Sequence, residues 1–135
     1  MLTYGFAKTA GYQIRDLVMS GEQSNFVVDR PDKRSSLSIK LNMPGRHNVL
    51  NATAAIAVAS DEGISDEAII EGLKKFDGVG RRFEILGNYP VASGSAMLVD
   101  DYGHHPTEVD ATIQTVRDSW PGKRLIMVFQ PHRYS

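Results

Sequence analysis

A short glycine-containing break, Gly78-Val79-Gly80, divides this chain of 135 residues into two segments with different patterns of apolar residues. Glycine weakens both helices and strands, so a break of this kind interrupts regular secondary structure. Before the break, apolar residues recur first with the spacing of strands and then with the spacing of helices. After the break, strand and helix patterns alternate. We therefore predict a domain boundary near Gly80, with one domain over residues 1–80 and another over residues 81–135.

The first segment begins with the pattern of an antiparallel meander. Leu37, Ile39 and Leu41 alternate with polar residues, which is the period of a half-buried strand, and residues 25–29 are its expected neighbour. Between them, residues 30–33 read Arg-Pro-Asp-Lys. This order favours a turn, because proline presets φ and aspartate bonds its own backbone.

Two helices are expected to follow the meander and to pack on it. Asn48 is expected to cap an alanine-rich helix that stops at Gly63, a residue suited to the left-handed position after a helix. Ser65 is expected to cap the second helix. The apolar face of this second helix is formed by Ile69, Leu73 and Phe76.

The second segment predicts a strand, a helix and a strand. Residues 96–99 and 125–129 are short apolar runs, and Pro106 opens a helix between them. The apolar positions of that helix are Val109, Ile113, Val116 and Trp120. This length, about 30 residues, is that of a βαβ crossover, which joins parallel strands. Two strands and one helix cannot cover a sheet on both faces, so the unit is expected to be incomplete.

Both predicted strands lead into polar loops, residues 100–105 (DDYGHH) and residues 130–134 (QPHRY). Parallel strands end at one edge of a sheet, where ligands of open sheets bind. We therefore expect the two loops to lie close together and to form a site.

Amide and imidazole side chains form another candidate cluster. Asn48 and Asn51 are three residues apart, so one helical face could present both amides to a purine edge beside His47. Helix capping explains Asn48 equally well. Arg81 and Arg82 are either a solvated pair or a phosphate clamp at the domain junction.

The acidic and imidazole groups of the first loop leave several interpretations open. Asp100 and Asp101 could bond ribose hydroxyls, capture a phosphate-bound divalent cation, or serve as turn and cap residues. One of His104 and His105 could cap the helix while the other faces the ligand. Direct transition-metal binding with His132 is a weaker interpretation, because no pair of histidines has helical i, i+4 spacing.

Composition excludes several classes of function. The net charge of −1 argues against a nucleic-acid platform, and the absence of cysteine excludes disulfides, thiolate zinc sites and thiol catalysis. The apolar runs are too short for a membrane span, and residues 1–20 lack the pattern of a signal peptide. These features are compatible with the cytoplasm. Neither a G-x-x-x-x-G-K-[ST] loop nor a G-x-G-x-x-G fingerprint occurs, so a complete nucleotide-hydrolysing site is missing from these residues.

Four motifs carry a resemblance to a known family: residues 45–52 (GRHNVLNA), 80–84 (GRRFE), 100–108 (DDYGHHPTE) and 129–134 (FQPHRY). On these motifs the chain resembles the Mur ligase family. The first two are shared widely with folylpolyglutamate synthase relatives, whereas the last two resemble the member that adds L-alanine. The fold that this implies is α/β: a meander with helices from the central ATP-binding domain, followed by the first βαβ of a Rossmann-like C-terminal ligase domain.

The resemblance implies an ATP-dependent ligase of peptidoglycan synthesis. ATP with Mg²⁺ would phosphorylate the carboxylate of UDP-N-acetylmuramate, and the amine of L-alanine would then attack the acyl phosphate. By the same resemblance, His47, Asn48 and Asn51 would lie at adenine, Arg82 would reach the nucleotide and Asp101 would bond its ribose. The residues implied around the reacting carboxylate and the amino acid are Tyr102, His104, His132 and Arg133.

The resemblance covers only the end of the central domain and the beginning of the C-terminal domain. The phosphate loop, the main magnesium ligands and the UDP site are missing, so we expect an inactive fragment of a cytoplasmic enzyme with no nucleic-acid or membrane partner. Its oligomeric state is left open. The alternatives are a metal-dependent phosphohydrolase, which would retain a transition metal, and a small nucleotide-binding module, which would bind ATP tightly by itself.

Overall fold

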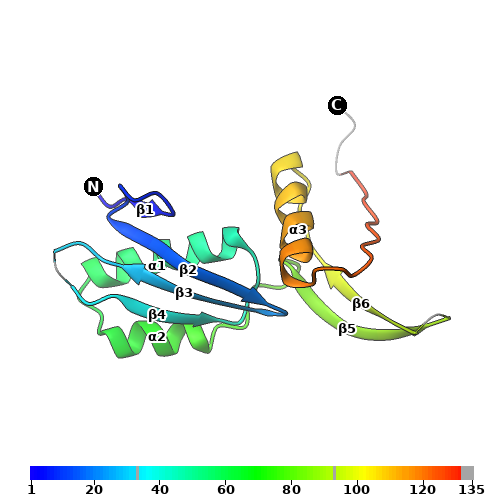
Figure 1. The fold of residues 1–135 in the computed structure, drawn as a ribbon, viewed down its shortest axis with the longest axis horizontal. Helices are drawn as coiled ribbons and strands as arrows, with labels where there is room; N and C mark the ends of the chain where they lie inside the picture. The colour runs from blue at the N-terminus through cyan, green and yellow to red at the C-terminus, as the bar shows by residue number, and fades with distance from the viewer. Residues whose placement is uncertain (33, 93, 132–135) are drawn as a thin grey trace.

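The structure is a computed structural model that describes residues 1–32, 34–92 and 94–131. In chain order its elements are β1 (Tyr4–Gly5), β2 (Tyr12–Ser20), β3 (Gln23–Asp29), β4 (Leu37–Leu41), α1 (Arg46–Asp61), α2 (Asp66–Lys74), β5 (Glu84–Val91), β6 (Gly94–Asp100) and α3 (Pro106–Ser119). Figure 1 shows an elongated molecule in which α3 stands between the sheet of β1–β4 and the hairpin of β5 and β6. The mixed α/β class expected from the sequence is confirmed.

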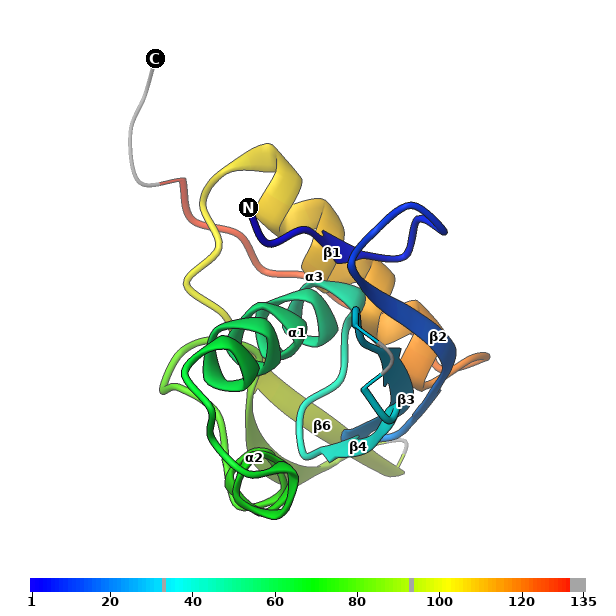
Figure 2. The same ribbon diagram turned by 90° about the vertical axis from the view of Figure 1, so that its left-hand side faces the viewer.

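The first part of the molecule is a four-stranded sheet with α1 and α2 on one face (Figure 2). The strand order is β1-β2-β3-β4, with β1 parallel to β2 and the other pairs antiparallel, so the expected meander is confirmed. Apolar side chains from the strands and both helices form one buried cluster. Its members are Tyr12, Ile14, Phe26, Val28, Leu37, Ile39, Leu41, Met43, Val49, Ala52, Ile56, Ala57 and Ile69.

The first helix starts earlier than the sequence predicted. Its N-cap is Gly45, and Asn48 lies inside the helix, so the expected capping role of Asn48 is wrong. The reason is local. Gly45 has a φ of 102°, and the helix begins at the next residue. The Asn48 side-chain amide donates to the Pro44 carbonyl at 2.8 Å and therefore does not cap the helix. The left-handed Gly63 and the Ser65 cap, whose hydroxyl accepts from the backbone N–H three residues on, are confirmed.

The second helix, in contrast, is shorter than expected. It ends at Lys74, so Phe76 follows the helix instead of continuing its apolar face. Ile69 is buried and Leu73 is half-buried against the core, as predicted, whereas Phe76 is exposed.

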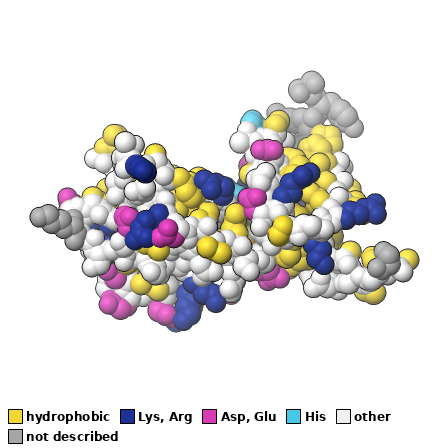
Figure 3. All heavy atoms as spheres, in the orientation of Figure 1, with side chains coloured by type: hydrophobic (Ala, Val, Ile, Leu, Met, Phe, Trp, Pro, Cys, Tyr) yellow, Lys and Arg dark blue, Asp and Glu magenta, His cyan; other side chains and the backbone are white. Residues whose placement is uncertain are grey.

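The second part of the molecule differs from the predicted crossover. β6 pairs antiparallel with β5, and residues 125–129 form no strand, so the predicted parallel pair is wrong. A hairpin closes through a short local turn, whereas a parallel pair needs a full crossover. Residues 125–129 are exposed as a result, as are Leu86 and Leu98 of the hairpin, and Figure 3 shows hydrophobic side chains over this part.

Helix α3 begins at Pro106 as predicted, and the structure shows which histidine caps it. The His105 ring Nδ1 accepts the Thr107 N–H at 3.3 Å, and Glu108 completes a capping box. The other end of α3 packs on the first part of the molecule. Thr115 and Ser119 are buried there, and the Gly21 N–H donates to the Ser119 carbonyl at 3.4 Å.

None of the helices in the described ranges has the length and apolar character that a membrane crossing requires.

A buried arginine ties the β3–β4 connection to α2, and its removal gives a first prediction. Arg30 has a side chain that is only 4% exposed, and its Nη1 and Nη2 each lie 2.7 Å from an Asp66 carboxylate oxygen. Its Nε donates to the Ser35 carbonyl. Arg30→Ala should therefore lower the free energy of unfolding by about 2–3 kcal/mol in urea denaturation. Arg15→Ala, which breaks exposed ion pairs with Asp16 and Asp29, is the matched control and should have a much smaller effect.

The pH dependence of this effect has a definite sign. Hydrogen bonds from Arg30 lower the pKa of Asp66, so the pair stabilises the fold above the ordinary carboxyl pKa. The difference between the wild-type chain and Arg30→Ala should shrink as pH falls below about 4. A difference that stays constant down to strongly acidic pH would contradict this assignment.

Candidate functional site

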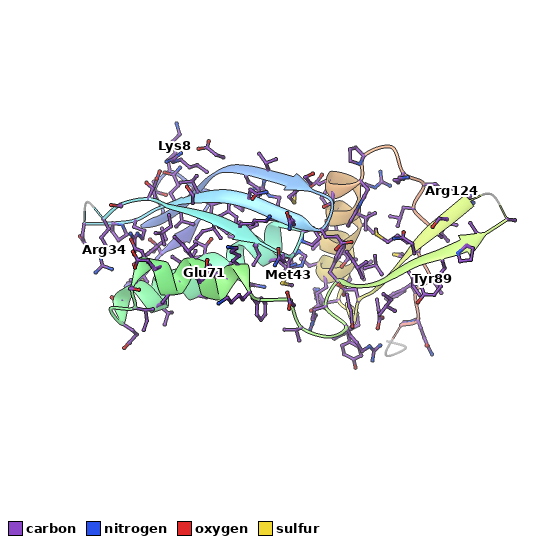
Figure 4. All side chains as sticks on the ribbon, turned by 90° about the horizontal axis from the view of Figure 1, so that it is seen from below. Lys8, Arg34, Met43, Glu71, Tyr89 and Arg124 are labelled. Atoms are coloured by element: carbon purple, nitrogen blue, oxygen red, sulfur yellow. The ribbon has the colours of Figure 1, made fainter. Side chains whose placement is uncertain are left out.

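A cavity of about 660 Å³ lies where the two parts of the molecule meet, between α1, the end of α2 and the first turns of α3. Its apolar walls come from both parts: Leu41, Met43, Ala52, Ala55, Leu73, Phe76, Val79 and Ala111. Figure 4 shows Met43 at the end of the first part that faces α3. The residues that the family resemblance implies at the nucleotide also line this cavity, namely His47, Asn48, Asn51, Arg82 and Asp101.

The first turns of α1 contribute an imidazole and two amides to the site, and the two amides differ in burial and hydrogen bonding. Asn48 is buried, and its amide nitrogen is committed to the Pro44 carbonyl. Asn51, one turn later, is exposed. Burial is the main cause that lowers the pKa of His47; Arg82 adds to this effect and Asp101 opposes it. His47 is therefore neutral at neutral pH, with one nitrogen as donor and the other as acceptor.

Arg82 reaches the cavity from a tight turn. Its neighbours Arg81 and Phe83 both have left-handed backbones, with φ of 59° and 52°. Two carboxylates hold this turn: Glu84 accepts the Arg81 N–H at 2.7 Å, and Asp101 accepts the Phe83 N–H at 3.0 Å. Such conformations persist where surrounding contacts over-determine them, so the position of the Arg82 backbone is set by its neighbours.

Asp101 is fixed in the cavity wall by two backbone groups. Besides the Phe83 N–H, its carboxylate accepts the Gly103 N–H at 2.6 Å. A Cβ on Gly103 would lie 2.8 Å from the same oxygen, so only glycine allows this approach. Each carboxylate oxygen has a second lone pair, and the group can therefore still accept hydrogen bonds from a ligand.

Of the residues expected around the reacting groups, Tyr102 and His104 follow Asp101 in the chain and do not line the cavity. The Arg81 guanidinium is 4.9 Å from the centre of the Tyr102 ring, and the Tyr102 and His104 rings meet edge to face at 5.8 Å. His132 and Arg133 lie outside the described residues. The expected meeting of the two polar loops therefore stays a prediction.

Glu108 lines the cavity as well, and the sequence did not single it out as a site residue. Its signal was the spacing His105-x-x-Glu108, which is that of a capping box. The proposed transition-metal cluster does not form among the residues that the structure describes, which contain no group of three or more His, Asp or Glu side chains able to hold a metal. His105 Nδ1 and the Asp101 carboxylate instead accept hydrogen bonds from the backbone.

Comparison with known proteins defines the class of this chain. Residues 1–59 match the Mur ligase middle domain, and residues 81–134 match the Mur ligase glutamate ligase domain. The chain belongs to the Mur ligase family, whose members are ATP-dependent amide-bond ligases that use Mg²⁺, so the family predicted from the motifs is confirmed. The domain boundary near Gly80 stays a prediction.

Three solved structures show how far this likeness extends. UDP-N-acetylmuramate-alanine ligase MurC from Thermotoga maritima is 34% identical over 98% of this chain, with a TM-score of 0.84. MurF from Acinetobacter baumannii is 28% identical over 87% of the chain, with a TM-score of 0.72. A pseudomurein peptide ligase type C from Methanothermus fervidus is 30% identical over 85%, with a TM-score of 0.65. The chain spans 30%, 24% and 21% of these three proteins, respectively.

Proposed function

We propose that this chain is the part of an alanine-adding Mur ligase that binds the adenosine end of ATP between the central and C-terminal domains. One observation carries the proposal: five residues assigned to the nucleotide from separate motifs line a single cavity at the junction of the two parts. The choice of alanine is supported by the motifs at residues 100–108 and 129–134 and by the 34% identity to the Thermotoga enzyme.

The cavity suits a purine nucleoside. Its apolar walls can cover the faces of the base, as in most small-molecule sites, while a few polar groups fix its orientation. Asn51 is exposed on the α1 side and can offer both an amide donor and a carbonyl acceptor to the edge of adenine. Asn48, whose amide nitrogen already bonds the Pro44 carbonyl, would contribute only its oxygen.

The opposite wall suits the ribose and the phosphates. Asp101 is held rigidly and presents acceptors for ribose hydroxyls. Arg82 carries a guanidinium fork, which is suited to phosphate oxygens. Mg²⁺ bound to those phosphates would neutralise part of their charge. We infer that its protein ligands lie in other parts of the ligase.

In the whole enzyme, Tyr102, His104, His132 and Arg133 would surround the muramate carboxylate of UDP-N-acetylmuramate and the incoming L-alanine. An arginine can bind the alanine carboxylate bidentately, and a nearby imidazole can orient the reacting groups or move a proton. We place this enzyme in the cytoplasm.

Asn51→Ala tests the assignment of the base. In the full-length ligase this change should raise the KM for ATP about tenfold and alter kcat by less than twofold, because a contact remote from the reacting phosphate binds substrate and transition state alike. Asn88→Ala, which removes an exposed amide from β5, is the matched control and should change neither constant. An unchanged KM in Asn51→Ala would contradict the adenine assignment.

The isolated chain of 135 residues should have neither ligase nor ATPase activity. Phosphate binding in this class relies on backbone N–H groups and a lysine of a glycine-rich loop, and that motif does not occur in this sequence. The measurement is release of ADP in the presence of UDP-N-acetylmuramate, with and without L-alanine. ADP release that depends on L-alanine would overturn the expectation for ligase activity, and ADP release from ATP without L-alanine would overturn it for ATPase activity.

A further inference from the structure

The carboxylate of Glu108 is shared between the start of α3 and Arg82. Its Oε2 accepts the backbone N–H groups of His104 and His105 at 3.1 and 3.2 Å. Its Oε1 accepts from Arg82 Nη1 at 3.4 Å. One oxygen is thus fixed by the backbone of the helix cap, while the other faces a guanidinium at the rim of the cavity.

This arrangement provides Arg82 with a fixed anchor. The Arg82 side chain is half exposed, and a long side chain in that setting has many rotamers to choose from. The contact with Glu108 engages Nη1 and leaves the other donors of the guanidinium for a ligand. Both side chains line the same cavity, so the anchor and the group that it orients belong to one site.

We propose that Glu108 is a positioning residue that orients Arg82 toward the phosphates of the bound nucleotide. This inference rests on the proposed function. Preorganising a long side chain removes part of the entropy that would otherwise be lost on binding. Charge alone predicts the opposite effect of Glu108 on nucleotide affinity. A carboxylate near the phosphates repels them, so its removal would tighten binding.

Glu108→Gln separates the two effects in the full-length ligase. Glutamine keeps an oxygen for the two N–H groups of the helix cap, since Gln also forms capping boxes, but it loses the charge that holds Arg82. We expect the Kd for ADP, measured by calorimetry, to rise about threefold to tenfold. Asp110→Asn removes the same charge from an exposed position of α3 and should leave the Kd unchanged or lower it.

The double variant decides between positioning and a general effect on structure. With Arg82→Ala as the background, the additional change Glu108→Gln should not alter the Kd for ADP further, because the side chain that it orients is gone. An equal loss in both backgrounds, or a Glu108→Gln variant that binds ADP as tightly as the wild type, overturns the inference. If Arg82→Ala itself leaves ADP affinity unchanged, the proposed role of Arg82 in nucleotide binding fails, and this inference fails with it.

Discussion

Gly45→Ala should lower the free energy of unfolding by about 2–5 kcal/mol, since it adds backbone strain and overpacking at one position. Gly45 is buried with a φ of 102°, a conformation that side chains rarely adopt. A Cβ there would lie 2.7 Å from Thr115 Oγ1 and 2.8 Å from the His47 ring carbon Cε1. The Thr115 hydroxyl cannot easily withdraw, because the side chain is buried and bonds the Ala111 carbonyl at 2.7 Å.

The same substitution should weaken nucleotide binding. Gly45 is the N-cap of α1 and Thr115 belongs to α3, so relief of the clash between them separates the two helices that line the cavity. Gly87→Ala is the control: it has a φ of 122°, but its Cβ would meet nothing within 4 Å. Urea denaturation and ADP calorimetry on both variants measure the two effects. If the two substitutions lowered stability and ADP affinity equally, backbone strain alone would explain the effect of Gly45→Ala. The close approach of α1 and α3 would then have no role in it.

Asp101→Ala is expected to have the second large effect. The change removes the acceptor for the Phe83 and Gly103 N–H groups, and the loss of two hydrogen bonds to a charged group should cost about 3–5 kcal/mol of stability. It also releases the turn that carries Arg82, so affinity for ADP should fall by more than tenfold. Loss of the Phe83 bond should loosen the stack of that ring on Trp120, whose centroids are 6.2 Å apart.

The neighbouring residue supplies the control for this prediction. Asp100 forms a half-exposed ion pair with Arg81 at 3.1 Å and does not line the cavity. Asp100→Ala should therefore change stability and ADP affinity much less than Asp101→Ala. If the two variants behaved alike in chemical denaturation and in ADP titration, the bracing role assigned to Asp101 would be wrong.

The parts of the fold that the sequence predicted well depend on local patterns. Two examples are the alternation at Leu37, Ile39 and Leu41 and the proline that opens α3. Each acts within a few residues, so it can be recognised in the sequence. The strand predicted over residues 125–129 failed because a strand exists only with a partner, and β6 found its partner in the adjacent β5. The N-cap at Gly45 was not predicted, because capping preferences favour asparagine over glycine. They also do not predict that the Asn48 amide bonds the Pro44 carbonyl.

The candidate site was predicted as a set of residues but not as a geometry. Family motifs pointed to His47, Asn51 and Asp101, and the structure brings these side chains to one cavity. The apolar walls and the contribution of Glu108 depend on how α3 packs against α1, which no local pattern encodes. The choice between His104 and His105 as the helix cap likewise needed three-dimensional information.

The most direct test of the central claim is a crystal structure of the full-length ligase with a non-hydrolysable ATP analogue. The account predicts adenine in the cavity between α1 and α3, with its edge at the Asn51 amide and the ribose at the Asp101 carboxylate. Adenine bound elsewhere, for example in the polar cavity of about 500 Å³ beside Asp77 and Glu84, with the first cavity empty, would contradict it.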